Sequence, residues 1–243
     1  MKILALDSSG LVASVAVVED EVLIAEYTVN YKKTHSQTLL PMLQAVKEMT
    51  DLELSAIDAI AIAAGPGSFT GLRIGSATAK GLGLALDKPI VEVPTVAGLA
   101  YNLWGTEKIV CPIMDARRNQ VYTGIYAFET VKGENDSACR MVTVKEQCAV
   151  DISEIIGELN ALDKPVVFLG DGVPVYREKI ETQMKTDFCF AASHCNRQRA
   201  AAVAALAEIY YKEGRVVDAG AHQPLYLRLS QAERERLEQE NGV

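Results

Sequence analysis

Short apolar runs dominate the start of the chain. Runs at residues 3–7, 12–18 and 22–29 are separated by two short polar segments, Ser8-Ser9-Gly10 and Glu19-Asp20-Glu21. Short polar turns between runs rich in β-branched residues are typical of antiparallel hairpins. The pattern therefore predicts three antiparallel strands.

Helical spacing then alternates with single apolar runs. Leu39, Leu40, Leu43 and Val46 follow a 3.6-residue period, which predicts a helix that begins near Ser36. The elements expected after it are a strand at 58–63, a helix at about 72–86, a strand at 90–93 and a helix that opens at Pro94-Thr95. The first half is thus predicted to contain three strands, then helix, strand, helix, strand and helix.

The second half repeats this order. Its predicted strands lie at 108–114, 119–128, 139–144, 166–169 and 188–190, and its predicted helices lie near 152–159, from about 173, and at about 198–212. Two βββαβαβα units indicate an α/β protein with a duplicated ribonuclease-H-like fold, the architecture of the actin, hexokinase and Hsp70 (ASKHA) group. We expect a first domain at residues 1–106, a second at 107–230 whose last helix can pack back on the first, and a charged tail at 231–243.

Composition places the chain among globular proteins. Of its 243 residues, 49% are hydrophobic and 23% are charged, so the chain can bury a substantial core. Its 32 Asp and Glu outnumber its 24 Lys and Arg, and the net charge of −8 is opposite in sign to what an autonomous nucleic-acid binder needs. We therefore expect any RNA contact to come through a partner.

Targeting and cysteine patterns favour the cytoplasm. No apolar run approaches the ~18 residues of a membrane span, and Asp7 interrupts the first run too early for a signal peptide. The five cysteines are scattered and lack a CxxC pair, so neither a disulfide framework nor a zinc ribbon is predicted. We expect a cytoplasmic protein with reduced thiols and no membrane contact.

The turn after the first strand, Asp7-Ser8-Ser9-Gly10, has two interpretations. In the actin group the corresponding turn holds nucleotide phosphate through backbone amides, and a metal-water shell through the aspartate. The same residue types also favour an ordinary tight turn, and these four residues alone favour the turn. The matching segment of the second half, residues 115–122, is predicted to be a salt-linked hairpin.

A glycine-rich segment, Gly65-Pro66-Gly67-Ser68-Phe69-Thr70-Gly71, lies between a predicted strand and a helix, a junction that suits an anion. Leu72 and Arg73 stand where a Walker phosphate loop carries its lysine and hydroxyl, which excludes that loop. The GxGxxxG spacing, with Glu92 about 20 residues on, approaches a dinucleotide fingerprint. A dinucleotide-dependent oxidoreductase that uses the 65–71 loop is therefore the alternative function. The antiparallel hairpins before the loop argue against it, and a purely structural turn is the third interpretation.

Four small residues recur at intervals of four in the next predicted helix: Gly71, Gly75, Ala79 and Gly83. Glycine inside a helix costs about 1 kcal/mol relative to alanine, so the row implies a compensating close contact. Small residues allow helices to approach closely, and the contact can be with the sheet or with a helix of another subunit. The spacing favours neither.

Candidate catalytic chemistry is sparse. His194-Cys195 with Cys189 offers too few ligands for a metal cluster, and the other two histidines stand alone. The nucleophile elbow GxSxG is absent, because Pro66 and Thr70 occupy its glycine positions around Ser68. We expect neither a catalytic nor a metal-binding residue.

Five segments together resemble one family. They are Asp7-Ser8-Ser9, residues 35–41 (HSQTLLP), residues 65–75 (GPGSFTGLRIG), Asp115-Ala116-Arg117-Arg118 with Val121-Tyr122, and residues 224–228 (PLYLR). They span nearly the whole chain in order, and residues 65–75 are the most specific. On these segments the sequence resembles the TsaB family, also called YeaZ.

The resemblance implies a duplicated actin-like fold and a non-catalytic role in bacterial tRNA modification. It implies a dimerisation or activating subunit of the complex that adds a threonylcarbamoyl group to the tRNA adenosine next to the anticodon. The catalytic partner is then a TsaD-like paralogue, a TsaE-like ATPase is a further partner, and tRNA is reached only through the complex. Residues 93–100 (VPTVAGLA) lack the histidine pair that holds the metal of TsaD, so no cofactor, metal site or metallopeptidase activity is expected.

The resemblance also implies where partners dock. Family dimers form through the two helices of the first half, which assigns the interface to Leu39, Leu43, Gly71, Gly75, Ala79 and Gly83. A homodimer through the same surface stays open, as does weak nucleotide binding by Asp7, Ser8 and Ser9. Tight ATP binding is not expected, because the adenosine clamp GGxxxN is absent near Gly170. Gln120 stands where the family often carries Glu.

Overall fold

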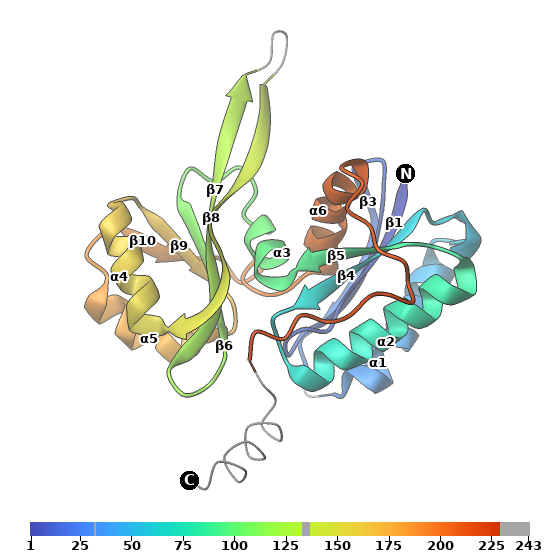
Figure 1. The fold of residues 1–243 in the computed structure, drawn as a ribbon, viewed down its shortest axis with the longest axis horizontal. Helices are drawn as coiled ribbons and strands as arrows, with labels where there is room; N and C mark the ends of the chain where they lie inside the picture. Colours follow the sequence, from blue (N-terminus) through green and yellow to red (C-terminus); the bar gives the residue numbers. More distant parts are fainter. Residues whose placement is uncertain (32, 133–136, 229–243) are drawn as a thin grey trace, which may run out of the picture.

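The computed structural model describes residues 1–31, 33–132 and 137–228, which form two five-stranded sheets flanked by helices (Figure 1). The first sheet contains the strands β1 (Lys2–Asp7), β2 (Ala13–Glu19), β3 (Val22–Val29), β4 (Ala59–Gly65) and β5 (Ile90–Pro94). The same half of the chain contains the helices α1 (His35–Met49), α2 (Phe69–Leu86) and α3 (Thr95–Tyr101), and a 3-10 turn at Leu54–Ala56.

The second sheet follows in the chain. Its strands are β6 (Ile109–Asp115), β7 (Gln120–Lys132), β8 (Ser137–Asp151), β9 (Val166–Leu169) and β10 (Phe188–Phe190). The helices of this half are α4 (Ile152–Leu162), α5 (Gly172–Gln183) and α6 (Ala200–Lys212).

The two sheets share one topology. Their strand orders are β3-β2-β1-β4-β5 and β8-β7-β6-β9-β10. In each sheet the first three strands pair antiparallel, and the last two are added in parallel on the other side of the first strand. Ile3, for example, lies opposite Val18 on β2 and Ala59 on β4. The repeated order confirms the predicted duplication of a ribonuclease-H-like unit.

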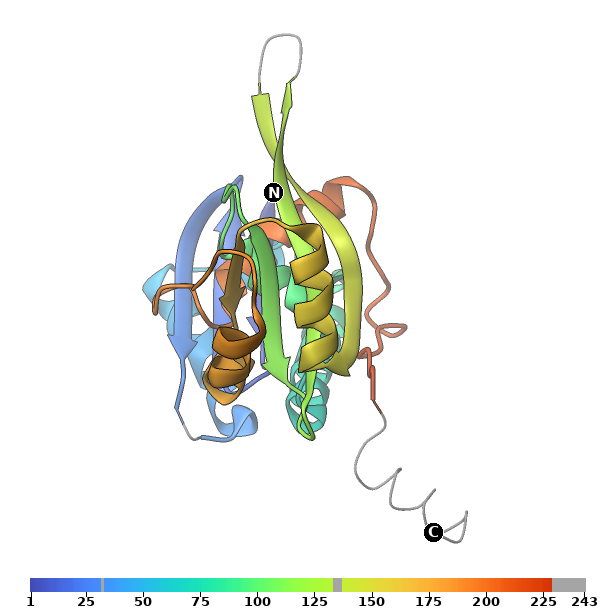
Figure 2. The ribbon, with the colours of Figure 1, turned by 90° about the vertical axis from the view of Figure 1, so that its left-hand side faces the viewer.

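Most predicted elements are confirmed, and the largest difference is the length of β7 and β8. These strands pair from Gln120 opposite Asp151 to Lys132 opposite Ser137, well beyond the predicted 119–128 and 139–144. Figure 2 shows them rising as a twisted ribbon beyond the rest of the sheet. The outer part of this ribbon lacks a buried face, so its sequence lacks the apolar alternation that marks a strand. The predicted charged tail at 231–243 lies outside the described residues.

Helices α1 and α2 cover one face of the first sheet (Figure 1). Leu39 and Leu43 of α1 and Ala79 of α2 are buried in one cluster with Leu4 of β1 and Ile60 of β4. The 3.6-residue period of α1 thus places its apolar stripe on the sheet, as the sequence predicts.

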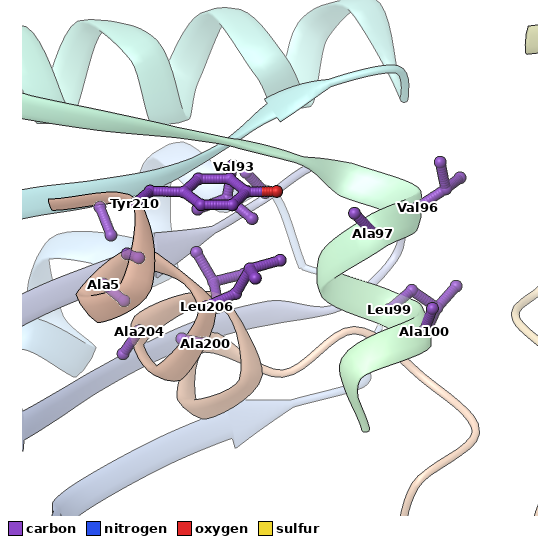
Figure 3. Packing of buried hydrophobic residues seen from close by; sticks show 14 of the residues in the cluster. Ala5, Val93, Val96, Ala97, Leu99, Ala100, Ala200, Ala204, Leu206 and Tyr210 are labelled. Atoms are coloured by element: carbon purple, nitrogen blue, oxygen red, sulfur yellow. The ribbon is translucent and has the colours of Figure 1, made fainter. Parts of the chain in front are cut away.

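The opposite face of the first sheet packs against α3 and α6. Figure 3 shows Leu206 and Tyr210 of α6 in the same buried layer as Ala97 of α3 and Val93 of β5. The cluster continues into the second sheet, where it includes Met114 of β6 and Val167 of β9. Although α6 follows the second sheet in the chain, it completes the core of the first.

Side chains of the first sheet also bind the first turn of α6. The Ala200 N–H donates to Ser14 Oγ at 2.8 Å, and the Ala201 N–H donates to Glu26 Oε1 at 3.1 Å. Glu26 also pairs with the Arg199 guanidinium. These side chains satisfy N–H groups that an isolated helix would leave without partners.

After α6 the chain returns across the first half, and we call residues 213–228 the C-terminal strap. Val217 and Ile90 exchange two backbone hydrogen bonds of 2.9 Å. The Lys80 ammonium on α2 donates to the carbonyl oxygens of Gly220 and His222, at 2.9 and 3.0 Å. These contacts hold the strap against α2 and β5.

Candidate functional site

A cleft of about 630 Å³ opens beside the carboxyl ends of β1, β4 and β6. It is lined by residues 9–11 after β1, residues 67–70 before and within α2, residues 114–117 after β6, and residues 226–228 of the strap. The crevice outside the carboxyl ends of parallel strands is where α/β folds usually bind ligands. The two turns that the sequence singles out, after Asp7 and at Asp115, therefore meet at one cleft.

Asp7 lies at the bottom of the first of these turns and is almost completely buried. Its Oδ1 atom accepts hydrogen bonds from the Ser9 N–H at 2.9 Å and the Ser9 hydroxyl at 2.7 Å. Burial raises the pKa of Asp7 to about 6, because desolvation disfavours the charged form more than the two Ser9 hydrogen bonds favour it. The carboxyl group thus helps to shape the turn.

The two serines of the turn serve the packing of α2. The Ser8 hydroxyl donates to the Gly71 carbonyl at 2.9 Å, and the Ser68 N–H donates to the Ser9 carbonyl at 2.7 Å. Ser8 and Ser9 are both buried. Asp7, Ser8 and Ser9 thus form a packed turn, and only Ser9 of the three lines the cleft. Weak phosphate binding by this turn stays a prediction.

The glycines of the 65–71 loop allow this close packing. A Cβ atom on Gly67 would lie 2.3 Å from the Ser9 carbonyl oxygen, and one on Gly71 would lie 2.1 Å from the Ser8 carbonyl oxygen. The turn after β1 therefore fills the space beside the loop that a dinucleotide pyrophosphate would need. The structural interpretation of the loop is supported, and the oxidoreductase alternative is not.

The row of small residues on α2 also faces inward. Gly71, Gly75, Ala79 and Gly83 are buried within the chain itself. A Cβ atom on Gly75 would lie 2.4 Å from Ser8 Oγ, and one on Gly83 would lie 2.6 Å from Ala219 Cβ. Leu39 and Leu43 are buried in the same layer. Within the chain these six residues are covered by the sheet, the Asp7 turn and the strap, and which residues touch a partner stays a prediction.

The exposed faces of α1 and α2 carry apolar side chains. Leu40 and Met49 on α1 are 54% and 87% exposed, and Leu84 on α2 is 64% exposed. Ala77 and Gly81 of α2 are exposed on the same helix. We call Ala77, Gly81 and Leu84, which lie on the side of α2 opposite its buried row, the outer helix face. Leu40 and Met49 are nine residues apart and lie on opposite flanks of α1. The sequence places Leu40 in the predicted stripe of α1, and the structure corrects this, because Leu40 is exposed whereas Leu39, Leu43 and Val46 are buried.

The second turn at the cleft differs from the expected salt-linked hairpin. Asp115 Oδ1 accepts hydrogen bonds from the Arg117 N–H at 2.8 Å and from the Tyr176 hydroxyl at 3.0 Å. The carboxylate therefore binds a backbone amide and a phenol rather than a guanidinium. Burial is the main cause that raises the pKa of Tyr176 to about 12, and the hydrogen bond to Asp115 adds to it.

Histidines and acids do not gather in the part of the chain that the structure describes. No group of three or more His, Cys, Asp or Glu side chains in it could hold a metal ion. His35 Nε2 lies 2.8 Å from the Gly10 carbonyl oxygen, and the buried His222 pairs with Glu92 through Nδ1 at 2.5 Å. None of the described helices is both long and apolar enough to cross a membrane.

Comparisons of this chain with family models and with known proteins agree with one another. The family model described as "TsaD: tRNA N6-adenosine threonylcarbamoyltransferase" matches residues 22–236. The tRNA threonylcarbamoyladenosine biosynthesis protein TsaB of Bacillus subtilis is 33% identical over 238 residues, which cover 98% of this chain and 99% of that protein. The protein of the same name from Haemophilus influenzae is 28% identical, with 94% of each chain covered.

Solved structures agree with these sequence relatives. YeaZ from Pseudomonas aeruginosa superposes with a TM-score of 0.72 at 29% identity, over 93% of this chain and 99% of that one. A second crystal structure from that organism, described as an uncharacterised protein with similarity to peptidase YeaZ, has a TM-score of 0.75 at 28% identity with the same coverage. Both support the fold described above.

Proposed function

Because this chain belongs to the TsaB (YeaZ) family, whose curated members are named tRNA threonylcarbamoyladenosine biosynthesis proteins, we propose that it is an accessory subunit of that pathway. In this proposal it binds a TsaD-like catalytic paralogue and activates it. A TsaE-like ATPase joins the complex as a further partner, and the complex works in the cytoplasm on tRNA. The transfer of the threonylcarbamoyl group takes place on the paralogue.

The outer helix face is the observation that carries this proposal. It places Leu84 in water on α2, and Leu40 and Met49 are exposed on the neighbouring helix α1. A contact that removes apolar surface from water would stabilise these side chains. Gly81 has open space around its Cβ position, so no internal contact explains a glycine in the middle of α2. An external helix that packs closely on α2 would explain it.

The proposal keeps the two helices of the first half as the docking elements but changes the residues that touch the partner. Small residues let α2 pack closely on the rest of the chain through the buried row at Gly71, Gly75, Ala79 and Gly83. The opposite side of the helix then contacts the paralogue. A homodimer of the lone chain would use the same outer helix face. Its apolar side chains suit either partner, and the heterodimer is favoured by the pathway that the family name gives.

The absence of a catalytic role is inferred from the groups available. Asp7 is buried, and its carboxylate accepts hydrogen bonds from Ser9. Helix α3 follows β5, the position that the metal-binding helix has in TsaD, but its sequence TVAGLAY contains no histidine. Among the described residues that line the cleft, we find no nucleophile placed beside a general base. The chain would therefore act by favouring the active state of its partner, which requires a higher affinity for that state.

Gly81→Leu tests the docking face. We expect this substitution to weaken the complex with the TsaD-like paralogue at least ~10-fold, because a leucine would separate two closely packed helices. Gly157→Leu on α4 is the matched control, since Gly157 is also exposed and has open space at its Cβ position. Size-exclusion chromatography with light scattering measures the complex, and both variants should stay folded because leucine favours helix over glycine.

The same proteins then enter a transfer assay on an unmodified tRNA transcript. We expect the paralogue to depend on the wild-type chain and on Gly157→Leu, and to lose most of that dependence with Gly81→Leu. A Gly81→Leu chain that binds and activates like wild type would refute the docking face. Activity of the paralogue that is independent of any form of this chain would refute the accessory role itself.

A further inference from the structure

The β6–β7 turn combines an uncommon backbone with two adjacent arginines. Arg117, Arg118 and Asn119 have φ angles of 63°, 57° and 60°. The left-handed region costs a residue with a Cβ atom about 1 kcal/mol or more, and asparagine tolerates it better than arginine. Glycine would suit positions 117 and 118 at lower cost, so the arginine side chains point to a role outside the backbone.

The turn is held by hydrogen bonds that leave the arginine side chains unused. Asp115 accepts from the Arg117 N–H and the Tyr176 hydroxyl, as described above. The Ala116 N–H donates to the Gln120 carbonyl at 3.0 Å, and the Gln120 N–H donates to the Arg117 carbonyl at 3.1 Å. The backbone is thus fixed while both guanidinium groups remain available.

Both arginines are exposed at an open part of the surface. Arg117 lines the cleft described above and, with Arg118, a shallow pocket beside α5. Neither guanidinium has a hydrogen-bond or ion-pair partner among residues 1–31, 33–132 and 137–228. The Arg228 guanidinium of the strap donates to the carbonyl oxygens of Ala116 and Arg117, which adds a third cation behind the turn.

The acidic groups near the turn are largely engaged. Asp151 pairs with Lys179 at 3.6 Å, and the half-buried Asp171 accepts from the Asp115 N–H at 3.3 Å. Glu178 shares the shallow pocket with Lys179 and the two arginines. Positive charge therefore faces outward here, on a chain whose net charge is −8.

We propose that Arg117 and Arg118 contact the phosphate backbone of tRNA, an inference that rests on the proposed function because that function supplies the tRNA. Guanidinium groups bind phosphate oxygens with two parallel hydrogen bonds, and two such groups on a fixed turn need little ordering. Tyr176 is the only aromatic residue among the described residues that line the shallow pocket, and its side chain is buried. This pocket therefore lacks an exposed ring on which a base could stack. The contact therefore positions the tRNA and does not read its sequence.

The proposal changes the expectation that tRNA is reached only through the partner. Most of the phosphate contacts would still come from other subunits, because the chain is acidic as a whole. The turn would add one or two contacts of its own.

A pair of matched double variants tests this contact. Arg117→Gln/Arg118→Gln removes both charges at the turn, and Arg140→Gln/Lys164→Gln removes two exposed charges elsewhere. Each full-length variant is mixed with the TsaD-like paralogue and titrated with an unmodified tRNA transcript, at ~50 to ~200 mM salt. The isolated chains are titrated in parallel at low salt.

We expect both variants to form the complex normally. The turn variant should raise the Kd for tRNA about tenfold, and it should reduce the slope of log K against log salt by about 1.5 to 2, as expected for two lost phosphate contacts. The control variant should match wild type. Arg117→Gly/Arg118→Gly should show the same loss with no loss of thermal stability, which separates the contact from misfolding.

The outcomes are distinguishable from those of the proposed function. An unchanged tRNA affinity and salt slope in the turn variants overturns the proposed contact. If the wild-type chain forms no complex, the proposed function fails. The titration of the isolated chains then still shows whether Arg117 and Arg118 contact tRNA. Equal losses in the turn and control variants would mean that only net charge matters, which also overturns the proposal.

Discussion

At the scale of single residues, α2 shows glycine in two opposite roles. Gly71, Gly75 and Gly83 lie where a Cβ atom would overlap the Asp7 turn or the strap, so they serve packing within the chain. Gly81 lies on the other side, where a Cβ atom would meet nothing within 4 Å. Gly75→Leu would therefore disturb the fold and could not test an interface, because a Cβ atom there would lie 2.4 Å from Ser8 Oγ.

Asp7 gives the residue-scale prediction. Its pKa is about 6 in the folded chain against an ordinary 3.8, so between these pH values the folded state keeps a proton that the unfolded state has released. The stabilisation is full below about pH 3.8 and is lost as the pH rises through about 6, by roughly 3 kcal/mol in total. Asp7→Asn keeps an oxygen acceptor for Ser9 and cannot titrate.

Urea denaturation at a series of pH values measures this effect. We expect the unfolding free energy of wild type to fall relative to that of Asp7→Asn as the pH rises from about 4 to about 7. Parallel curves for the two proteins would show that Asp7 is not desolvated in solution.

At the scale of elements, the sequence predicts what depends on local pattern. Strands such as 22–29 and 166–169 are found at their predicted residues, because apolar runs between polar turns define them. The side on which the small-residue row packs could not be predicted, since Ser8, which contacts Gly71, lies 63 residues away in the chain. The outer helix face could not be predicted from periodicity either, because its residues lie outside the buried row of α2.

The start of α6 provides the element-scale prediction. Ser14 is buried, accepts from the Ala200 N–H at 2.8 Å and lies 2.6 Å from the Thr28 hydroxyl. Ser14→Ala would leave a buried helix N–H and a hydroxyl without this partner, so we expect a loss of about 2 kcal/mol in unfolding free energy. Ser55→Ala, at an exposed serine, should change it by less than about 0.5 kcal/mol.

Chemical denaturation of the two serine variants decides the point. Equal stabilities would indicate that Glu26 alone satisfies the first turn of α6.

At the scale of the whole molecule, the halves of the chain are not the halves of the core. The face of the first sheet opposite α1 and α2 packs against α6, and the shared cluster contains residues of β1, β4 and α6 such as Ala5, Ala61 and Leu206. The predicted boundary at residues 106 and 107 therefore separates the first sheet from its cover. We expect a fragment of residues 1–106 not to fold as a monomer.

Expression of that fragment tests the expectation. It should bind a hydrophobic dye or aggregate, whereas a fragment to which residues 198–228 are joined by a flexible linker should show the two-state unfolding of a packed domain. A well-folded monomer of residues 1–106 would restore the boundary.

The late position of α6 in the chain also affects how the protein folds during its synthesis. The first sheet leaves the ribosome roughly 100 residues before α6, which at ordinary bacterial rates of synthesis is about 5 to 20 s. During that interval one apolar face of the sheet lacks the cover that α6 later provides. We therefore expect chaperones to bind the chain at this stage. We also expect folding to end with a slow step in which α6 packs on the first sheet and completes its core.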